Sequence, residues 1–565
     1  MLARASVGPD SLGSVVHDLI RQYELLRSER SNWDHMWQDI HDIVAPHSSN
    51  FTRTQFPGAR RNDQIYDTTN ALALEKFGAV LESLLTPRQQ LFHFFKASDD
   101  DLNKEKEVQL FFEQLNNNIF KTRRRPRSGY YDQFFESHKS LGMYGNQCMH
   151  TIPSKDGLGL SYRSIHIGAM WIDVDDRGVV DSFFYKWTMT AKAAIQKWGK
   201  EAPKAARDAV TQMDSFRPLE FLHVVAPRRF VRSEVLGSES MPWESWEISL
   251  DDQALIPVLN PVTGKLEESG GYIVPPYNYS RFSTNASEKH GRGPSMLVMG
   301  DNETLQRMER SSLLYGEHAV AAPLLSQSND LLSDGTSNLD LRSGAVNPGW
   351  LDARGEPRVK ALDNKFNWQV SEGLMEKKRN AINDAHFITL FQILVQTPEM
   401  TATEALIRAQ EKGQLIAPMV GRQQSESLGP MVERELSLLP VVGLMPELPE
   451  LLKEAEGEYE IEYSSSATRI QREEEVQGIR ATYVDIAGIA ELDPTVVEML
   501  DGPASVRFIA QARGVPPFLI RSEKEFDDIL AAQAERSEHQ ELLANAASVA
   551  STAKDASAAG IDISQ

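Results

Sequence analysis

Few residues in this 565-residue chain have the types and spacing that catalysis or metal binding requires. The acidic run DVDD at 173–176 could hold a divalent cation through carboxylate oxygens, but it lies where a hairpin turn is expected, and aspartates are common in turns. His41 and His47 have no third ligand in a recognisable pattern, so both are interpreted as ordinary surface or core histidines. The glycine-rich GRGP at 291–294 lacks the preceding strand and the third glycine of a dinucleotide-binding loop. None of these residues predicts a metal or a cofactor.

The sequence motifs of several enzyme classes are absent. It contains no GxxxxGK[ST], no GxSxG, no HExxH and no paired CxxC. The single cysteine, Cys148, has no partner for an intrachain disulfide and is interpreted as a small buried hydrophobic residue. We therefore expect a structural role without catalysis, while an enzyme with an unfamiliar site stays open as an alternative.

One basic cluster stands out in an acidic chain. The stretch KTRRRPR contains Lys121, Arg123, Arg124, Arg125 and Arg127. It is either a solvated loop or a surface that contacts phosphates or an acidic partner. The whole chain has a net charge of −21, which argues against tight wrapping of nucleic acid over its whole surface. It does not exclude a protein that handles DNA without gripping it.

The negative charge is concentrated near the C-terminus. Residues 441–565 hold 24 Asp and Glu against 10 Lys and Arg, a net charge of −14. One end of the molecule is therefore expected to be strongly acidic.

No segment of the sequence predicts export or a membrane span. The N-terminal MLARASVGPDSLGS lacks the apolar core of a signal peptide. The longest apolar stretch, FITLFQILV at 387–395, is much shorter than the roughly 20 residues that span a bilayer. We expect a soluble protein of a reducing compartment, with no membrane partner.

The first 300 residues predict an α+β domain. A long helix should begin at Ser11 and end before Pro46, with Arg30 as the one interruption of its apolar stripe, and a second should follow Asp67. Strands are then expected at LFHFFKA, SWEISL, ALIPVL and GGYIVPPY. Residues 169–190 are typical of a hairpin that turns at Asp176-Arg177-Gly178, with Thr190 capping the helix that follows.

The middle of the chain predicts a helix leading out, an irregular module and a helix leading back. One helix should begin at Asp301 and end before Pro323, and residues 324–362 are rich in turn-forming residues. A second helix should run from Asp363 to a break at Thr397-Pro398, after which Thr401 and Glu404 form a capping box that restarts it. Further on, 467–490 and 521–547 are expected to be helical, and the small-residue C-terminus is expected to fray.

The order of these segments resembles the portal, or head-to-tail connector, proteins of short-tailed bacteriophages. Coverage runs over about residues 10–440, and no single motif decides it. The stretches that carry the resemblance are RSERSNWDHMWQDIHDIVAP (27–46), YDTTNALALEKFGAVLESLLTPRQQLFHF (66–94), SHKSLGMYGNQCM (137–149), YRSIHIGAMWIDVDDRGVVDSFFYKWTMTAKAAIQKWG (162–199), FLHVVAPR (221–228), GGYIVPPYNYSRFSTNASEKHGRGPSM (270–296) and TATEALIR (401–408).

The resemblance implies a ring of about twelve copies at one capsid vertex of the virion, made in the host bacterial cytoplasm. Double-stranded DNA would pass through its axis without sequence specificity during packaging and ejection. The implied partners are the terminase large subunit, the major capsid and scaffolding proteins, and a tail adaptor protein. The implied parts are a wing at 1–300, stem helices at 301–322 and 363–395, a clip at 323–362, a channel loop at 396–400, a wing-return helix at 401–440, a crown at 441–520, and a helical barrel or disordered tail at 521–565.

The resemblance also places candidate DNA contacts. The channel loop would be Gln396, Thr397, Pro398, Glu399 and Met400, and it departs from the family in offering no Lys or Arg. Basic contacts would then come from the helices on either side, at Arg307, Arg310, Lys377, Lys378 and Arg379. Three alternatives stay open: these cations form intersubunit ion pairs or are simply exposed; 396–400 is a kink between domains; or the chain is a tail or scaffold component that forms no DNA channel.

Overall fold

The computed structural model describes residues 12–320, apart from 54–57, 60, 62–64, 89, 100, 233–236, 260–265 and 268, and, beyond 320, residues 324–326, 351, 354–357, 359–361, 368–389, 416–454, 459–463, 466–490 and scattered positions between 495 and 543. Its helices are α1 (Leu12–Glu29), α2 (Ser31–Val44), α3 (Thr69–Leu85), α4 (Lys106–Arg123), α5 (Tyr130–Tyr144), α6 (Ala191–Trp198), α7 (Lys204–Thr211), α8 (Pro294–Leu297), α9 (Met299–Val320), α11 (Trp368–Ala385), α14 (Gly429–Leu438), α15 (Glu450–Glu454), α16 (Ser466–Ala490) and α17 (Gly502–Ala512). Its strands are β1 (His93–Ala97), β2 (Asn146–Pro153), β3 (Leu160–Ser164), β4 (Met170–Val174), β5 (Val180–Thr190), β6 (Pro218–Pro227), β7 (Trp243–Ser249), β8 (Ala254–Ile256), β9 (Val258–Leu259), β10 (Leu266–Glu267), β11 (Gly270–Tyr272), β12 (Tyr277–Arg281), β13 (Leu324–Ser326), β14 (Val359–Ala361) and β15 (Tyr459–Tyr463).

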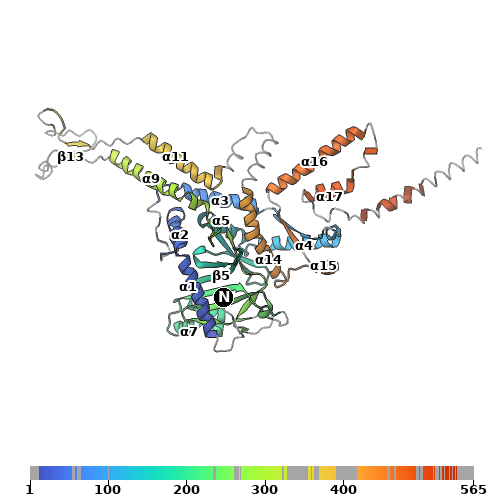
Figure 1. The fold of residues 1–565 in the computed structure, drawn as a ribbon, viewed down its shortest axis with the longest axis horizontal. Helices are drawn as coiled ribbons and strands as arrows, with labels where there is room; N and C mark the ends of the chain where they lie inside the picture. Colours follow the sequence, from blue (N-terminus) through green and yellow to red (C-terminus); the bar gives the residue numbers. More distant parts are fainter. Residues whose placement is uncertain are drawn as a thin grey trace, which may run out of the picture.

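The elements form a body of antiparallel sheets and helices from which α9 and α11 extend as a pair (Figure 1). This mixture confirms the expected α+β class. Among the described residues, no helix is long and apolar enough to cross a membrane.

The largest sheet has the strand order β11-β7-β6-β5-β4, and β8 pairs with β7. Side chains alternate between its two faces, as the pleat of a strand requires. Leu222 and Val224 of β6 face α1, whereas Leu219 and Phe221 face α6 and α7. The sheet is thus buried on both sides along β6, which explains why this strand is almost wholly apolar.

The expected hairpin at 169–190 is confirmed. Strand β4 pairs with β5, and Gly178 in the turn between them has a φ of 80°, a left-handed conformation that glycine adopts without strain. The Thr190 hydroxyl accepts a hydrogen bond from the Ala193 amide at 3.3 Å, so it caps α6 as expected.

The first helix differs from expectation at one residue. Helices α1 and α2 are separate because the chain turns at Arg30, and the Arg30 side chain is buried. Its guanidinium donates to the Met170 carbonyl at 2.6 Å and the Ile167 carbonyl at 3.1 Å, and lies 4.0 Å over the Trp171 ring. Arg30 therefore joins the helices to the sheet rather than interrupting the buried stripe, and Asp34 of α2, with Oδ1 2.9 Å from the Arg30 Nε, offsets its charge.

A second sheet of order β12-β2-β3 lies beside α5, which in turn packs on α3. Cys148 of β2 is fully buried in this layer, as expected for a small apolar side chain. The junction between α5 and β2 is tight. A Cβ at Gly145, whose φ is 68°, would lie 2.5 Å from the Arg292 carbonyl carbon and 2.6 Å from the Gly291 oxygen.

Replacing Gly145 by alanine should therefore destabilise the fold by about 2–4 kcal/mol, the sum of a left-handed alanine and a backbone clash. Gly157→Ala is the matched control, because Gly157 also has a φ of 68° but a Cβ added there would meet no atom within 4 Å. Thermal melting of both variants measures the difference. Equal melting temperatures would contradict the close packing of Gly145 against 291–293.

The chain beyond 415 returns to the body. Residues 416–423 are helical, a π-helical segment (Gln424–Leu428) follows, and α14 continues from it. Strand β15 then pairs with β1, antiparallel, with Phe95 opposite Ile461. The expected strand at 91–97 is confirmed from His93 onward, but its partner comes from a region for which the sequence indicated no strand.

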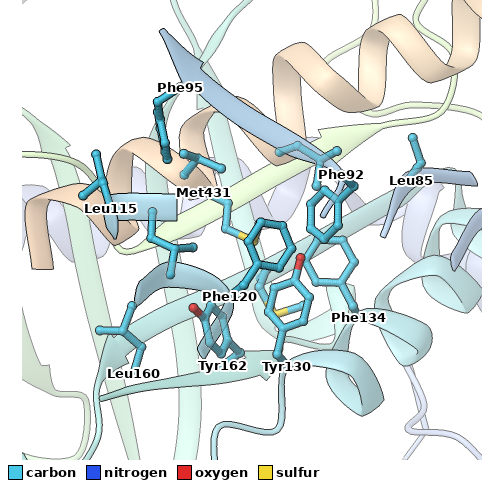
Figure 2. Packing of buried hydrophobic residues seen from close by; sticks show 14 of the residues in the cluster. Leu85, Phe92, Phe95, Leu115, Phe120, Tyr130, Phe134, Leu160, Tyr162 and Met431 are labelled. Carbon is cyan, nitrogen blue, oxygen red and sulfur yellow. The ribbon is translucent and has the colours of Figure 1, made fainter. Parts of the chain in front are cut away.

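The largest core cluster lies where α4, α5, β1 and α14 meet. Figure 2 shows the rings of Phe120, Tyr130 and Tyr162 close together, with Met431 of α14 reaching the same cluster. The Phe92 and Phe120 rings meet edge to face, with centroids 5.0 Å apart. Residues 77–162 and the C-terminal return thus share one core.

Candidate functional site

The α9/α11 pair projects from the body and is anchored at its base (Figure 1). Leu305, Met375 and Ile382 are fully buried between the two helices and α3, with Ala73 completing the cluster. This apolar base fixes the direction of the pair. At the far end β13 pairs with β14, so the outgoing and returning chains stay side by side.

The outer part of the pair exposes large apolar side chains. They are Leu313 and Leu314 of α9 and Val370 and Leu374 of α11. Each is about half exposed. Large apolar side chains exposed on a projecting helix pair suit a surface that another protein covers.

Arg379 does not offer a free charge. Its Nε lies 3.0 Å from Oδ2 of Asp67, and the same guanidinium pairs with Glu309 of α9. Burial alone would lower the pKa of Arg379, but Asp67 and Glu309 more than offset this and hold the pKa above its usual value. The side chain ties α11 to α9 and to the residues before α3, and the expected DNA contact at Arg379 stays a prediction.

The other four candidate cations differ in their surroundings. Lys378 pairs with Asp301 at 2.6 Å and also joins the two helices. Arg307 is exposed and pairs with Glu303, one turn earlier, at 3.4 Å, a pairing worth little in water. Arg310 and Lys377 are exposed as well. Arg307, Arg310 and Lys377 thus remain accessible to an anionic partner.

The candidate channel loop, residues 396–400, lies outside the described residues. The helix before it ends earlier than expected, because the chain turns at His386-Phe387 and Phe387 has a φ of 59°. His386 is held there, with Nε2 3.0 Å from the Ser295 hydroxyl of α8 and Nδ1 2.8 Å from the Ile382 carbonyl. Burial lowers its pKa to about 4, so the ring is neutral at neutral pH. The break expected at 397–398 is thus preceded by an anchored turn.

The basic cluster divides into buried and exposed arginines. The Arg123 and Glu435 side chains are both 0% exposed and pair through Nη2 and Oε2 at 2.5 Å. Burial by itself lowers the pKa of Arg123, and the adjacent Glu435 carboxylate more than reverses this, so the guanidinium stays charged. Arg123 is therefore corrected from a candidate surface contact to an internal tie between α4 and α14.

The rest of the cluster faces solvent beside the β2–β3 turn. Arg125 donates to the Leu158 carbonyl, and Arg127 lies 3.7 Å from Asp156. Lys121 and Arg124 are exposed. The turn also supplies an exposed lysine, Lys155, which the sequence reasoning missed because β2 and β3 had not been paired.

The acidic run at 173–176 forms the hairpin turn. Oδ1 of Asp175 accepts the amides of Arg177 and Val179, and Asp173 pairs with Lys289 at 2.9 Å. Within the described part of the chain, no three His, Cys, Asp or Glu residues are placed to hold a metal ion.

Comparison with known proteins identifies a family to which this chain is similar. A family described as bacteriophage head to tail connecting protein matches residues 16–520. The chain belongs to this family. Its members are structural proteins of the phage particle, as the resemblance indicated.

Two relatives are similar over nearly their whole length. The portal protein of Salmonella phage epsilon15 is 22% identical over 560 residues, which cover 95% of this chain and 94% of the relative. The probable portal protein of Bordetella phage BPP-1 is 21% identical over 511 residues, 89% of this chain and 88% of the relative. The match extends past residue 440, where the sequence alone had suggested none.

Proposed function

We propose that about twelve copies of this chain close into a ring at one capsid vertex and form the channel through which double-stranded DNA is packaged and later ejected. The observation that carries the proposal is the match of nearly the whole chain to head-to-tail connecting proteins. The projecting α9/α11 pair supports it, because its half-exposed leucines need a partner surface.

A ring requires two different faces on each copy that fit one another and a rotation that closes. We propose that the outer part of the α9/α11 pair supplies one such face, with Leu313 and Leu374 packing against the next copy. The ion pairs of Arg379 and Lys378 favour this, since they hold α9 and α11 in one fixed geometry within each copy. A rigid pair loses little conformational freedom on assembly.

The proposed parts follow the order of the chain. Residues 1–300 would form the wing, and α9 and α11 the stem, with the segment between them as the clip. The β13–β14 pairing supports a small module at that position. Residues 401–440 would return through the wing, which the burial of Glu435 against Arg123 supports. Residues 441–520 would then form the crown, with any barrel beyond it.

The charge of the chain suits a conduit. About twelve copies of a chain with net charge −21 sum to about −250, and such a surface repels DNA phosphates, so that the DNA can slide. The accessible cations Arg307, Arg310 and Lys377 would offer local, weak contacts along the stem. Lys121 and Arg124 would contact phosphates or an acidic partner away from it.

Energy for packaging would come from another protein. The chain has no GxxxxGK[ST] phosphate-binding loop, so we propose that the terminase large subunit drives the DNA through the ring. Major capsid and scaffolding proteins would surround the wing, and a tail adaptor would attach after packaging. The protein would be made in the host bacterial cytoplasm and remain in the virion.

The candidate channel loop gives a functional prediction. Replacing Gln396–Met400 by a helix-forming Ala, Glu and Lys stretch should join the helices on either side and distort the constriction. Rings should still form, whereas retention of packaged DNA should fail. Because the loop has no Lys or Arg, its contact with DNA should also depend little on salt. A variant that packages and retains DNA like the parent would contradict the loop assignment.

Particle mass tests the proposal against its alternatives. Mass photometry of the purified chain should show a species about twelve times the 63.4 kDa of one copy. An enzyme or an unrelated tail component is expected to give a small oligomer instead. A monomer or dimer at all concentrations would count against the ring.

A further inference from the structure

A polar cleft of about 560 Å³ lies between three segments that are distant in the sequence. One wall is the β4–β5 turn at 177–179, the second is the loop after β12 at 284–288, and the third is the helical segment at 418–426. Its volume is within the range of small-molecule sites. Its lining is mostly polar, which favours a hydrophilic ligand.

Arg281 holds the three walls together. Its Nη2 donates to the Gly178 carbonyl at 3.0 Å, and its Nη1 to the Lys289 carbonyl at 3.5 Å. The same guanidinium binds Glu426 through Nε and Nη2, at 3.3 and 2.9 Å. Because Arg281 is mostly buried and fully engaged, it fixes the cleft without taking part in ligand binding.

Both carboxylates that line the cleft are already paired. Glu426 accepts the Arg281 guanidinium and the Arg281 amide, the latter at 2.9 Å. Glu288 pairs with Arg292 at 2.5 Å and accepts from the Asn285 amide group at 2.8 Å. Their negative charge is therefore offset by groups that do not depend on a ligand.

Two further arginines line the cleft, and among the described residues the one carboxylate paired with either of them is Glu426, at the long distance of 3.9 Å from Arg422. Arg177 is exposed at the tip of the β4–β5 turn. Arg422 is half-buried, donates through Nη1 to the Thr284 hydroxyl, and lies no closer than 3.9 Å to Glu426. Because the Thr284 oxygen accepts from Arg422, its own proton is free to point to a ligand. Asp175 lies in the same turn as Arg177, but its carboxylate is occupied by turn amides and does not line the cleft.

We propose that this cleft binds a phosphate group, held between the guanidinium groups of Arg177 and Arg422 and hydrogen-bonded by the Thr284 hydroxyl. Guanidinium groups suit phosphate because they donate two parallel hydrogen bonds to its oxygens. The phosphate belongs either to a small free molecule, such as a nucleotide, or to the backbone of a DNA strand. This proposal rests on the residues that line the cleft, and it does not depend on the proposed DNA channel.

Isothermal titration calorimetry of the full chain with pyrophosphate tests the site. We expect one site per chain, with Arg177→Ala and Arg422→Ala each weakening binding at least about tenfold. Arg207→Ala is the control, because Arg207 is an exposed arginine on α7, outside the cleft. Arg177 lies on an exposed turn, so its variant should melt like the parent and keep the result interpretable.

A parallel titration with single-stranded oligothymidylate separates the two sources. Binding of pyrophosphate that depends on both arginines supports a small phosphate ligand. Binding of the oligonucleotide alone, with the same dependence, supports the DNA backbone. The proposal is overturned if neither probe binds, or if both variants bind like the parent. It is also overturned if a glutamate-rich peptide binds in an arginine-dependent way while both phosphate probes do not.

Discussion

Replacing Arg123 by methionine is expected to destabilise the protein by about 3–5 kcal/mol, because the change leaves the Glu435 carboxylate buried without its countercharge. The carboxylate would keep the Tyr162 hydroxyl, 2.5 Å from Oε1, but a neutral donor cannot offset a full charge in a dry core. His93 would also lose its contact with Arg123, which joins Nε2 and Nη1 at 2.8 Å. Since the pair links α4 to α14, we expect the C-terminal return to detach first.

Thermal melting followed by circular dichroism measures this effect. Arg127→Met is the matched control, because Arg127 belongs to the same basic cluster but is largely exposed and lies 3.7 Å from Asp156. It should change the melting temperature little, as exposed ion pairs usually do. If both variants melt at the same temperature, the buried Arg123–Glu435 pair does not hold α4 and α14 together.

Changing Trp37 to aspartate is expected to prevent correct folding, while the same change at Trp33 should be milder. Trp37 is 0% exposed and its ring lies 5.1 Å from His290 and 5.4 Å from Phe51, so an aspartate there would be an unpaired charge beside a large cavity. We expect Trp37→Asp to lower the free energy of unfolding by about 4 kcal/mol or more. Trp33 is only partly buried and lies under the Arg292 guanidinium at 5.1 Å, which could pair with the new carboxylate.

Soluble yield and melting temperature of the two variants give the comparison. We expect aggregated protein from Trp37→Asp and a folded protein with a lowered melting temperature from Trp33→Asp. Equal behaviour of the two would show that the difference in burial along α2 does not decide stability.

Local features of the fold were predictable from the sequence. The β4–β5 turn and the Thr190 cap depend on residues within a few positions of one another, and both are found as expected. The features that the sequence did not predict involve contacts between residues that are far apart in the chain. Arg123 meets Glu435 across 312 residues, and Arg30 meets Met170 across 140, so a local pattern shows only a charge where the fold buries a paired one.

The same reason limits what the sequence indicated about the candidate site. The sequence pattern placed the cations of α9 and α11 correctly on helices. It could not show that Arg379 pairs with Asp67, which lies 312 residues earlier in the chain. The turn at His386-Phe387 was missed because the apolar pattern continues through it and no Gly or Pro marks it. The pairing of β1 with β15 required knowledge of the tertiary fold, since neither strand can form alone.

Electron cryo-microscopy of the purified chain tests the central claim, that this protein forms a DNA conduit, most directly. We expect a closed ring of about twelve copies with an open axial channel. The α9/α11 pairs of adjacent copies should pack side by side around it, with Leu313 and Leu374 covered and 396–400 nearest the axis. A small oligomer, or a particle in which α9 and α11 lie away from any central opening, would contradict the claim.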